Sequence, residues 1–222
     1  MNGRVKRLIT SRSHPLVYLI TDRQRMLPLR NSVQLKALTE LISRAVDAEV
    51  DLLQIRERDL SACEVLALAD FATGIAGGSN TRILVNDRAD IAACAAAGVH
   101  LTTRSLNPGV VREAFGSELL IGASTHSMEE VQNASLGGVD FVVFGPIFET
   151  ESKLEYGPPV GLEALRRANS ESQVPVLALG GINERNFRQA LDAGAAGIAG
   201  ISMFNEAGDL ERLVKTIRNS RG

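Results

Sequence analysis

Short runs of apolar residues recur along the chain and are separated by longer segments of mixed character. Within each run, apolar and polar residues hardly alternate, which is typical of strands that are buried on both faces, as in a parallel sheet. Eight such runs predict eight strands, at residues 16–20, 52–55, 83–85, 98–101, 119–122, 141–144, 174–179 and 197–201.

Amphipathic helical patterns fill most of the gaps between these runs. Apolar residues share one helical face in two segments, the first with Leu35, Leu38, Leu41, Ile42 and Ala45, the second with Leu210, Leu213, Val214 and Ile217. Asp90 and Asn183 stand where helix N-caps are expected, because short polar side chains satisfy the first free N–H groups of a helix.

The alternation of strands and helices predicts the fold. Eight units in 222 residues leave about 28 residues for each, close to the minimum for a βα repeat, and eight such units close into a single (β/α)8 TIM barrel. An open doubly wound sheet is the competing architecture. It would carry a glycine-rich turn after the first strand, where this chain reads Thr21-Asp22-Arg23-Gln24. We expect one domain over residues 15–222, preceded by a disordered leader at residues 1–14.

Composition excludes several classes of protein. Hydrophobic residues make up 45% and charged residues 23%, with a formal net charge of −2. This balance is typical of a globular protein and gives no basic surplus for binding nucleic acid. No apolar stretch is long enough to cross a membrane, so we expect a cytoplasmic protein. Cys63 and Cys94 fall in predicted helices, and we expect both to be buried.

The loops that follow the predicted strands carry the candidate chemistry, because these loops meet at one end of a TIM barrel. Gly180, Gly181 and Ser202 follow the last two strands, where backbone N–H groups often bind a phosphate. A simple tight turn is the alternative. The long loop at residues 146–161 is a candidate lid over the site.

Cations and one acid in these loops suggest further binding groups. Arg56, Arg58 and Lys153 are suited to hold a second anion, such as a diphosphate or a carboxylate, although Arg58 has Glu57 and Asp59 as alternative surface partners. Asp87 is a candidate ligand for Mg²⁺, which often takes only one or two protein carboxylates. Its alternative role is to hold the neighbouring Arg88.

Two histidines have different expected roles. His126 follows a predicted strand and lies between small hydroxyl residues, so its imidazole is placed to transfer protons near neutral pH. A purely structural role is the alternative. His100 lies at the end of a predicted strand, and we expect it to be packed and hydrogen-bonded.

Taken together, these residues resemble the superfamily of thiamin phosphate synthase and the thiazole tautomerase TenI, over nearly the whole chain. The motifs that carry the resemblance are Tyr18-Leu19-Ile20-Thr21-Asp22, Gln54-Ile55-Arg56-Glu57, Asn86-Asp87-Arg88, Ser124-Thr125-His126, Gly145-Pro146-Ile147-Phe148, Thr150-x-Ser152-Lys153 and Gly180-Gly181-Ile182. The resemblance implies a TIM barrel that takes part in making thiamin. It also implies substrate-binding roles for Gln54, Arg56, Arg58, Asn86, Ser124, Thr150, Ser152 and Lys153.

The resemblance leaves the reaction open between two enzymes. The synthase joins hydroxymethylpyrimidine diphosphate to thiazole phosphate with the help of Mg²⁺. Here Arg58 replaces the synthase lysine, and Ser105 stands where a second acidic metal ligand is expected. The tautomerase moves a proton on a carboxylated thiazole phosphate and needs no cofactor. It shares Arg58 and Ser105, and it gives His126 the proton transfer.

These two positions favour the tautomerase, with the synthase as the alternative. A protein that binds thiazole phosphate or thiamin phosphate without turnover is a third possibility. The expected partners are small phosphorylated molecules, together with a possible second copy of the chain, and neither nucleic acid nor a membrane.

Overall fold

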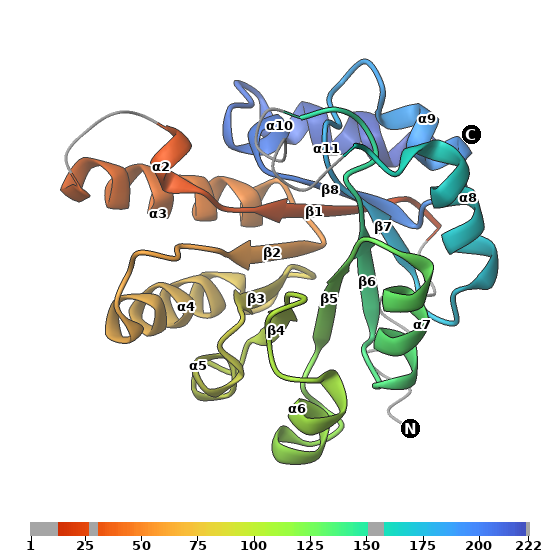
Figure 1. The fold of residues 1–222 in the computed structure, drawn as a ribbon. Coiled ribbons are helices and arrows are strands. Elements are labelled where there is room, and N and C mark those ends of the chain that lie inside the picture. The colour runs from red at the N-terminus through yellow and green to blue at the C-terminus, as the bar shows by residue number, and fades with distance from the viewer. Residues whose placement is uncertain (1–12, 27–30, 151–157, 221–222) are drawn as a thin grey trace.

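Eight parallel strands form a closed barrel in which consecutive strands pair and β8 pairs with β1. The structure is a computed structural model that describes residues 13–26, 31–150 and 158–220. Helices surround the strands (Figure 1). The predicted (β/α)8 TIM barrel is therefore confirmed. The strands are β1 (Leu16–Ile20), β2 (Leu52–Ile55), β3 (Arg82–Asn86), β4 (Gly98–Leu101), β5 (Ile121–Thr125), β6 (Phe141–Phe144), β7 (Val176–Ala178) and β8 (Gly197–Gly200).

The helices follow the strands in sequence, and most strand-to-strand connections contain one helix. Two amphipathic patterns are confirmed: Leu38, Ile42 and Ala45 are buried on α3, and the four predicted apolar residues of α11 are buried as well. The helices are α2 (Arg23–Met26), α3 (Asn31–Asp47), α4 (Ala62–Ala76), α5 (Ala89–Cys94), α6 (Pro108–Phe115), α7 (Met128–Leu136), α8 (Gly161–Glu171), α9 (Phe187–Asp192), α10 (Ser202–Asn205) and α11 (Leu210–Arg218).

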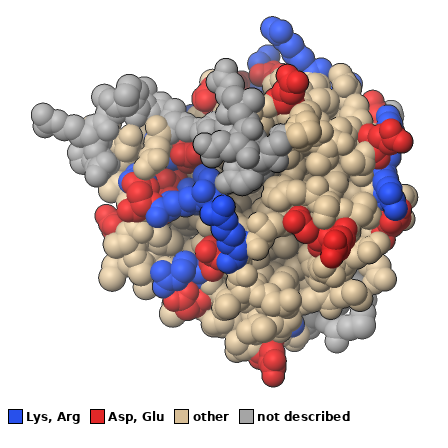
Figure 2. Space-filling model, in the orientation of Figure 1, with Lys and Arg blue, Asp and Glu red and all other residues tan. Residues whose placement is uncertain are grey.

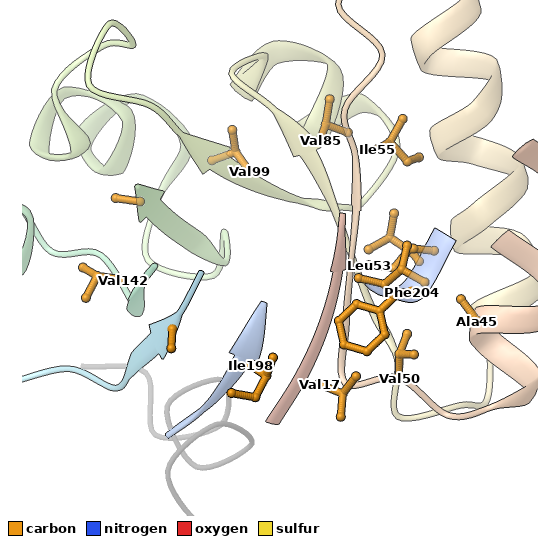
Figure 3. Packing of buried hydrophobic residues seen from close by; sticks show 14 of the residues in the cluster. Val17, Ala45, Val50, Leu53, Ile55, Val85, Val99, Val142, Ile198 and Phe204 are labelled. Carbon is orange, nitrogen blue, oxygen red and sulfur yellow. The ribbon is translucent and has the colours of Figure 1, made fainter. Parts of the chain in front are cut away.

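The strands separate two hydrophobic cores. The inner core fills the barrel and includes Tyr18, Leu84 and Phe141, whereas the outer core lies between the strands and the helices. Part of the outer core is drawn in Figure 3, where Val17 and Leu53 from the strands lie close to Phe204. Because successive strand residues point into different cores and both cores are largely apolar, the strands show little alternation of apolar and polar residues.

Four of the eight predicted strands have the expected bounds, and β5 shows why others shift. The apolar run at 119–122 predicted a strand there, but pairing begins at Ile121 and continues to the polar Thr125. The N–H of Ile121 donates to the carboxylate of Asp140, 2.8 Å away, at the start of the strand. Apolar character therefore marks burial, whereas the hydrogen-bond register with β4 and β6 sets where the strand ends.

Two expectations about helix residues are wrong. Both cysteines are exposed, although we expected them to be buried. Cys63 lies in the first turn of α4, away from the buried face formed by Leu68, Ala69, Ala72 and Ala76. Asp90 lies inside the first turn of α5 and pairs with Arg88.

The second wrong N-cap is Asn183, which precedes α9. The N-cap of that helix is Asn186, and the Asn183 side chain accepts a hydrogen bond from the N–H of Arg185 instead. Asparagine thus forms a local turn ahead of the helix rather than capping it.

Several expectations fall on residues outside the described part of the chain. These are most of the leader at 1–14, the middle of the loop at 146–161, and the side chains of Ser152 and Lys153. Among the residues that the structure does describe, no helix is both long and apolar enough to cross a membrane.

Candidate active site

A cavity of about 570 Å³ opens at the carboxyl ends of the strands. Its walls come from the loops after β1 to β5, together with Leu179 and Ile201 after β7 and β8. Seven of the residues singled out in the sequence line it: Gln54, Arg56, Arg58, Asn86, Asp87, Ser124 and His126. The structure thus brings residues from the ends of three strands, β2, β3 and β5, to one hollow, in the place where TIM barrels hold their active sites.

The remaining candidates lie beside this cavity or outside the described residues. Gly180 and Ser202 directly follow Leu179 and Ile201, which line the cavity, so the predicted phosphate loops border it. Thr150 is the last described residue before the segment that contains Ser152 and Lys153. The roles expected for these three residues stay predictions.

A buried ion-pair network supports the loop after β2. The guanidinium of Arg23 donates to Glu57 at 3.0 Å and to both oxygens of Asp59 at 2.6 Å. The side chains of Arg23 and Glu57 are each only 1% exposed. The hydroxyl of Thr21 donates to Glu57 at 2.7 Å. Glu57 and Asp59 therefore bind Arg23, and the alternative in which either one pairs with Arg58 is wrong.

The charges in this network perturb one another in opposite directions. Hydrogen bonding to Asp59 is the main cause that raises the pKa of Arg23, while its bonds to Arg23 lower the pKa of Asp59. Burial raises the pKa of Glu57, against the hydrogen bonds from Thr21 and Arg23. The network ties the loop after β2 to the start of α2, and this fixes the backbone from which Arg56 and Arg58 project.

Two guanidinium groups face the cavity close to each other. Arg56 pairs with Asp22 at 3.4 Å, and burial together with the positive charge of Arg58 lowers the pKa of Arg56. Arg58 is exposed and has no ion-pair partner among the described residues. On the face shown in Figure 2, a group of Lys and Arg side chains lies among carboxylates. Two neighbouring cations in one hollow are suited to bind an anion with several charges.

Asp87 is the acid best placed to hold a metal. Its carboxylate has no hydrogen-bond or ion-pair partner in the described part of the chain, and Arg88 pairs with Asp90 at 2.5 Å instead. Asp87 therefore does not serve to hold Arg88. Its backbone has a φ of 65°, a left-handed conformation that few residues other than glycine adopt and that often marks functional positions.

The surroundings of Asp87 fit Mg²⁺ only in part. No group of three or more His, Cys, Asp or Glu side chains suited to a metal occurs among the described residues. The hydroxyl of Ser105, at the second expected metal position, accepts a hydrogen bond from the N–H of Thr102 at 2.7 Å. One free carboxylate suffices for Mg²⁺ when phosphate oxygens and water supply the other ligands. The residues thus fit the metal as a partner of a bound diphosphate.

His126 has its proton placed by the backbone. Its Nδ1 lies against the carbonyl oxygen of Gly145, which can only accept, so Nδ1 carries a hydrogen and the neutral imidazole has its lone pair on Nε2. The backbone N–H of His126 donates to Glu130 at 2.5 Å. Because His126 is half-buried and lines the cavity, Nε2 is available there as a proton acceptor.

A chain of hydrogen bonds crosses the barrel at the bottom of the cavity. It runs from Asn86 to Gln54 (2.9 Å), to Tyr18 (3.0 Å), to His100 (3.1 Å) and to Ser124 (2.9 Å). Burial lowers the pKa of His100 to about 3 and raises that of Tyr18, so both are neutral near pH 7. The packed, hydrogen-bonded role expected for His100 is confirmed.

Gly180 and Gly181, which follow β7, are required by the local packing as well as being candidates for binding phosphate. The φ angles of Gly180 and Gly181 are 99° and 64°, and a Cβ on Gly181 would lie 2.4 Å from the carbonyl oxygen of Glu149. Close packing against the loop after β6 thus requires glycine here. The carbonyls of the pair accept from Phe148 and Asn186, while their N–H groups have no acceptor among the described residues.

We therefore predict that inorganic phosphate binds to these N–H groups. Titration of the ¹⁵N-labelled protein with phosphate should shift the amide resonances of Gly180, Gly181 and Ser202, because helix and loop N–H groups bind anions through their partial positive charge. The amides of the exposed Gly78 and Gly116, which follow the C-terminal ends of helices α4 and α6 and do not line the cavity, serve as controls. Shifts confined to other amides would contradict the prediction.

Some site residues were not identified from the sequence. Asp22, Arg88 and Arg104 line the cavity, and Tyr18 lies under it in the hydrogen-bonded chain. The first three follow β1, β3 and β4, so a uniform treatment of every residue after a strand would have found them. Tyr18 lies within a strand, and its sequence position shows only that it is buried.

Comparison with known proteins agrees with this geometry. The profile of a family described as thiamine monophosphate synthase matches residues 17–204. A protein of Geobacter sulfurreducens provisionally named thiamine-phosphate synthase is 42% identical over 84% of each chain. The thiamine-phosphate synthase of a Roseiflexus species is 34% identical over 91% of this chain and 83% of its own. Thiamine phosphate pyrophosphorylase from Pyrococcus furiosus superposes with a TM-score of 0.79 at 29% identity, over 99% of this chain and 97% of that one.

Proposed function

Because the chain belongs to the thiamine monophosphate synthase family, we propose that it joins hydroxymethylpyrimidine diphosphate to thiazole phosphate and releases diphosphate. The observation that carries the proposal is the cavity in which Arg56, Arg58 and the unpaired carboxylate of Asp87 come together. Two cations and a free acid suit a substrate whose leaving group carries several negative charges.

Each part of the substrate pair has a proposed place. Arg56 and Arg58 bind the diphosphate and stabilise the charge that grows on it as it leaves. Asp87 holds Mg²⁺, which supplies further positive charge to the leaving diphosphate when bound. Gln54, Asn86 and Ser124 bind the pyrimidine ring on the floor of the cavity. The N–H groups of Gly180, Gly181 and Ser202 bind the phosphate of the thiazole, with Thr150, Ser152 and Lys153 contributing from the loop after β6.

This proposal differs from the reaction favoured by the sequence. Arg58 and Ser105 favoured the tautomerase, but the similar proteins are named thiamine-phosphate synthase or thiamine phosphate pyrophosphorylase. Arg58 keeps the positive charge of the lysine that it replaces, and Asp87 keeps a free carboxylate. Arg58 is thus compatible with diphosphate release, although arginine and lysine differ in geometry, and Ser105 leaves Asp87 as the one carboxylate for Mg²⁺.

A turnover assay with both substrate sets, with and without Mg²⁺, tests the proposal. The wild-type protein should form the joined product only with Mg²⁺. We predict that Ser105→Asp lowers the Mg²⁺ concentration needed for half-maximal rate, because it restores a carboxylate at the position where the family resemblance implies a second acidic metal ligand. Ser105→Asn, of similar size and uncharged, is the matched control. Joining that is independent of Mg²⁺, or tight binding without turnover of either set, would contradict the synthase proposal.

The tautomerase remains a second candidate because of the geometry of His126. His126 lines the cavity and its Nδ1 is taken up by the carbonyl of Gly145, so Nε2 is the nitrogen left to accept the proton that isomerisation of a carboxylated thiazole phosphate requires. If this reaction occurs, His126→Asn should lower its rate by about 10²–10⁴-fold, since asparagine hydrogen-bonds but cannot transfer the proton. An isomerisation assay without metal measures this rate. An asparagine variant that isomerises at the wild-type rate would remove His126 from the reaction.

A further inference from the structure

The hydrogen-bonded chain on the barrel floor has a defined direction. Tyr18 has a single hydroxyl hydrogen, and it donates to the amide oxygen of Gln54, whose own NH₂ group donates to Asn86. The oxygen of Tyr18 must then accept from His100, so the hydrogen of the neutral imidazole lies on Nδ1. Nε2 of His100 is left as an acceptor, and the hydroxyl of Ser124 donates to it.

We propose that Tyr18 and His100 are positioning residues that fix the polarity of the substrate pocket. Ser124, with its hydrogen committed to His100, offers only lone pairs to a ligand. Asn86 uses its oxygen to accept from Gln54 and offers its N–H groups to a ligand. Tyr18 does not line the cavity, and His100 borders it with only 2% of its surface exposed. The two residues act through Ser124 and Asn86.

Burial isolates this arrangement from other hydrogen-bond partners. Tyr18 is 0% and His100 is 2% exposed, so no bulk water can supply an alternative partner for either ring. Phe141 packs edge-on against Tyr18, with ring centroids 5.7 Å apart, and it also borders His100. As long as Gln54 presents its amide oxygen to Tyr18, an imidazole with its hydrogen on Nε2 would leave the oxygen of Tyr18 facing an unprotonated Nδ1 without a hydrogen between them. That unmet buried pair opposes the other tautomer.

The polarity selects among ring substrates. A planar heterocycle that lies across the floor must present an acceptor to Asn86 and an N–H donor to Ser124. A ring with the opposite order would set two acceptors against each other at Ser124 and two donors at Asn86, which costs affinity. The assignment of such a ring to the pyrimidine substrate rests on the proposed function, whereas the polarity itself belongs to the free protein.

The first test needs no substrate. The ¹⁵N–¹H correlation spectrum of the histidine rings at pH 7 should show His100 neutral and protonated on Nδ1. A neutral ring protonated on Nε2, or a charged ring, would overturn the proposal. Because this measurement is made on the free wild-type protein, it stays decisive even if the protein joins no substrates, and that outcome would count against the proposed function alone.

The second test uses Tyr18→Phe, which removes the hydroxyl and keeps the ring. We expect a mixture of His100 tautomers and a rise in KM for hydroxymethylpyrimidine diphosphate on the order of tenfold, with KM for thiazole phosphate unchanged. Thr125→Val is the matched control. Thr125 is buried next to Ser124, but its hydroxyl donates to the carbonyl of Val143, which is not part of the hydrogen-bonded chain. A folded Tyr18→Phe protein with wild-type tautomer and KM values would overturn the proposal. If the variant does not fold, the wild-type spectrum decides.

Discussion

Replacement of Arg23 by methionine should lower the free energy of unfolding by about 3–5 kcal/mol, the usual cost of breaking a buried ion pair by removing one partner. Glu57 would still accept the hydrogen bond from the hydroxyl of Thr21, but it would lose the cation that compensates its buried charge. Asp59 is 42% exposed and can regain water, so most of the loss falls on Glu57. Urea denaturation followed by circular dichroism measures the effect.

Two further variants separate this cause from others. Arg88→Met breaks an exposed pair with Asp90, and such pairs contribute only about 0–1 kcal/mol. Glu57→Gln, added to Arg23→Met, removes the uncompensated charge and should restore part of the lost stability. An Arg23→Met protein within about 1 kcal/mol of the wild type, or a double variant no more stable than the single one, would show that the pair does not stabilise the loop after β2.

The barrel could be predicted because burial on both faces leaves a direct mark on strand composition. The run at residues 141–144 is apolar throughout, and the structure has β6 at Phe141–Phe144. Strand β5 shows the limit of this signal, since Ser124 and Thr125 pair with β6 although they are polar. Strand pairing depends on hydrogen bonds to the backbone of a neighbouring strand. The apolar pattern of a single segment carries no information about that neighbour.

The sequence allowed us to predict which loops form the site. It did not allow us to predict which side chains form ion pairs with one another there. The rule that strand ends meet correctly brought Arg56, Asp87 and His126 to one cavity. It did not show that Glu57 and Asp59 bind Arg23 rather than Arg58. Such choices depend on the direction in which each side chain leaves the loop, and residues 34 or 36 positions apart in sequence compete with immediate neighbours.

The chain of hydrogen bonds under the cavity was the feature that the sequence predicted least. Tyr18 and His100 are 82 positions apart, on β1 and β4, which do not pair. They meet because the barrel is closed and both side chains point into its interior. The order of the strands in the barrel therefore decides the contact between Tyr18 and His100. No local sequence pattern around either residue predicts it.

The Asp87→Asn variant should lose joining activity by at least on the order of 100-fold, because it removes the only free carboxylate that the structure offers to Mg²⁺ in the cavity's described walls. Asparagine tolerates a positive φ about as well as aspartate does, so the loop should keep its shape. Steady-state assays over a range of Mg²⁺ concentrations measure the loss, and circular dichroism checks the fold.

Asp90→Asn is the matched control for this prediction. Asp90 lies three residues further along, is exposed and pairs with Arg88, and it does not line the cavity. Its amide variant should join the two substrates at the wild-type rate. If Asp87→Asn also keeps that rate, the carboxylate holds no metal and Arg56 and Arg58 stabilise the leaving diphosphate without it. A loss of joining with an unchanged rate of thiazole isomerisation would assign Asp87 to diphosphate release alone, since proton transfer by His126 needs no metal.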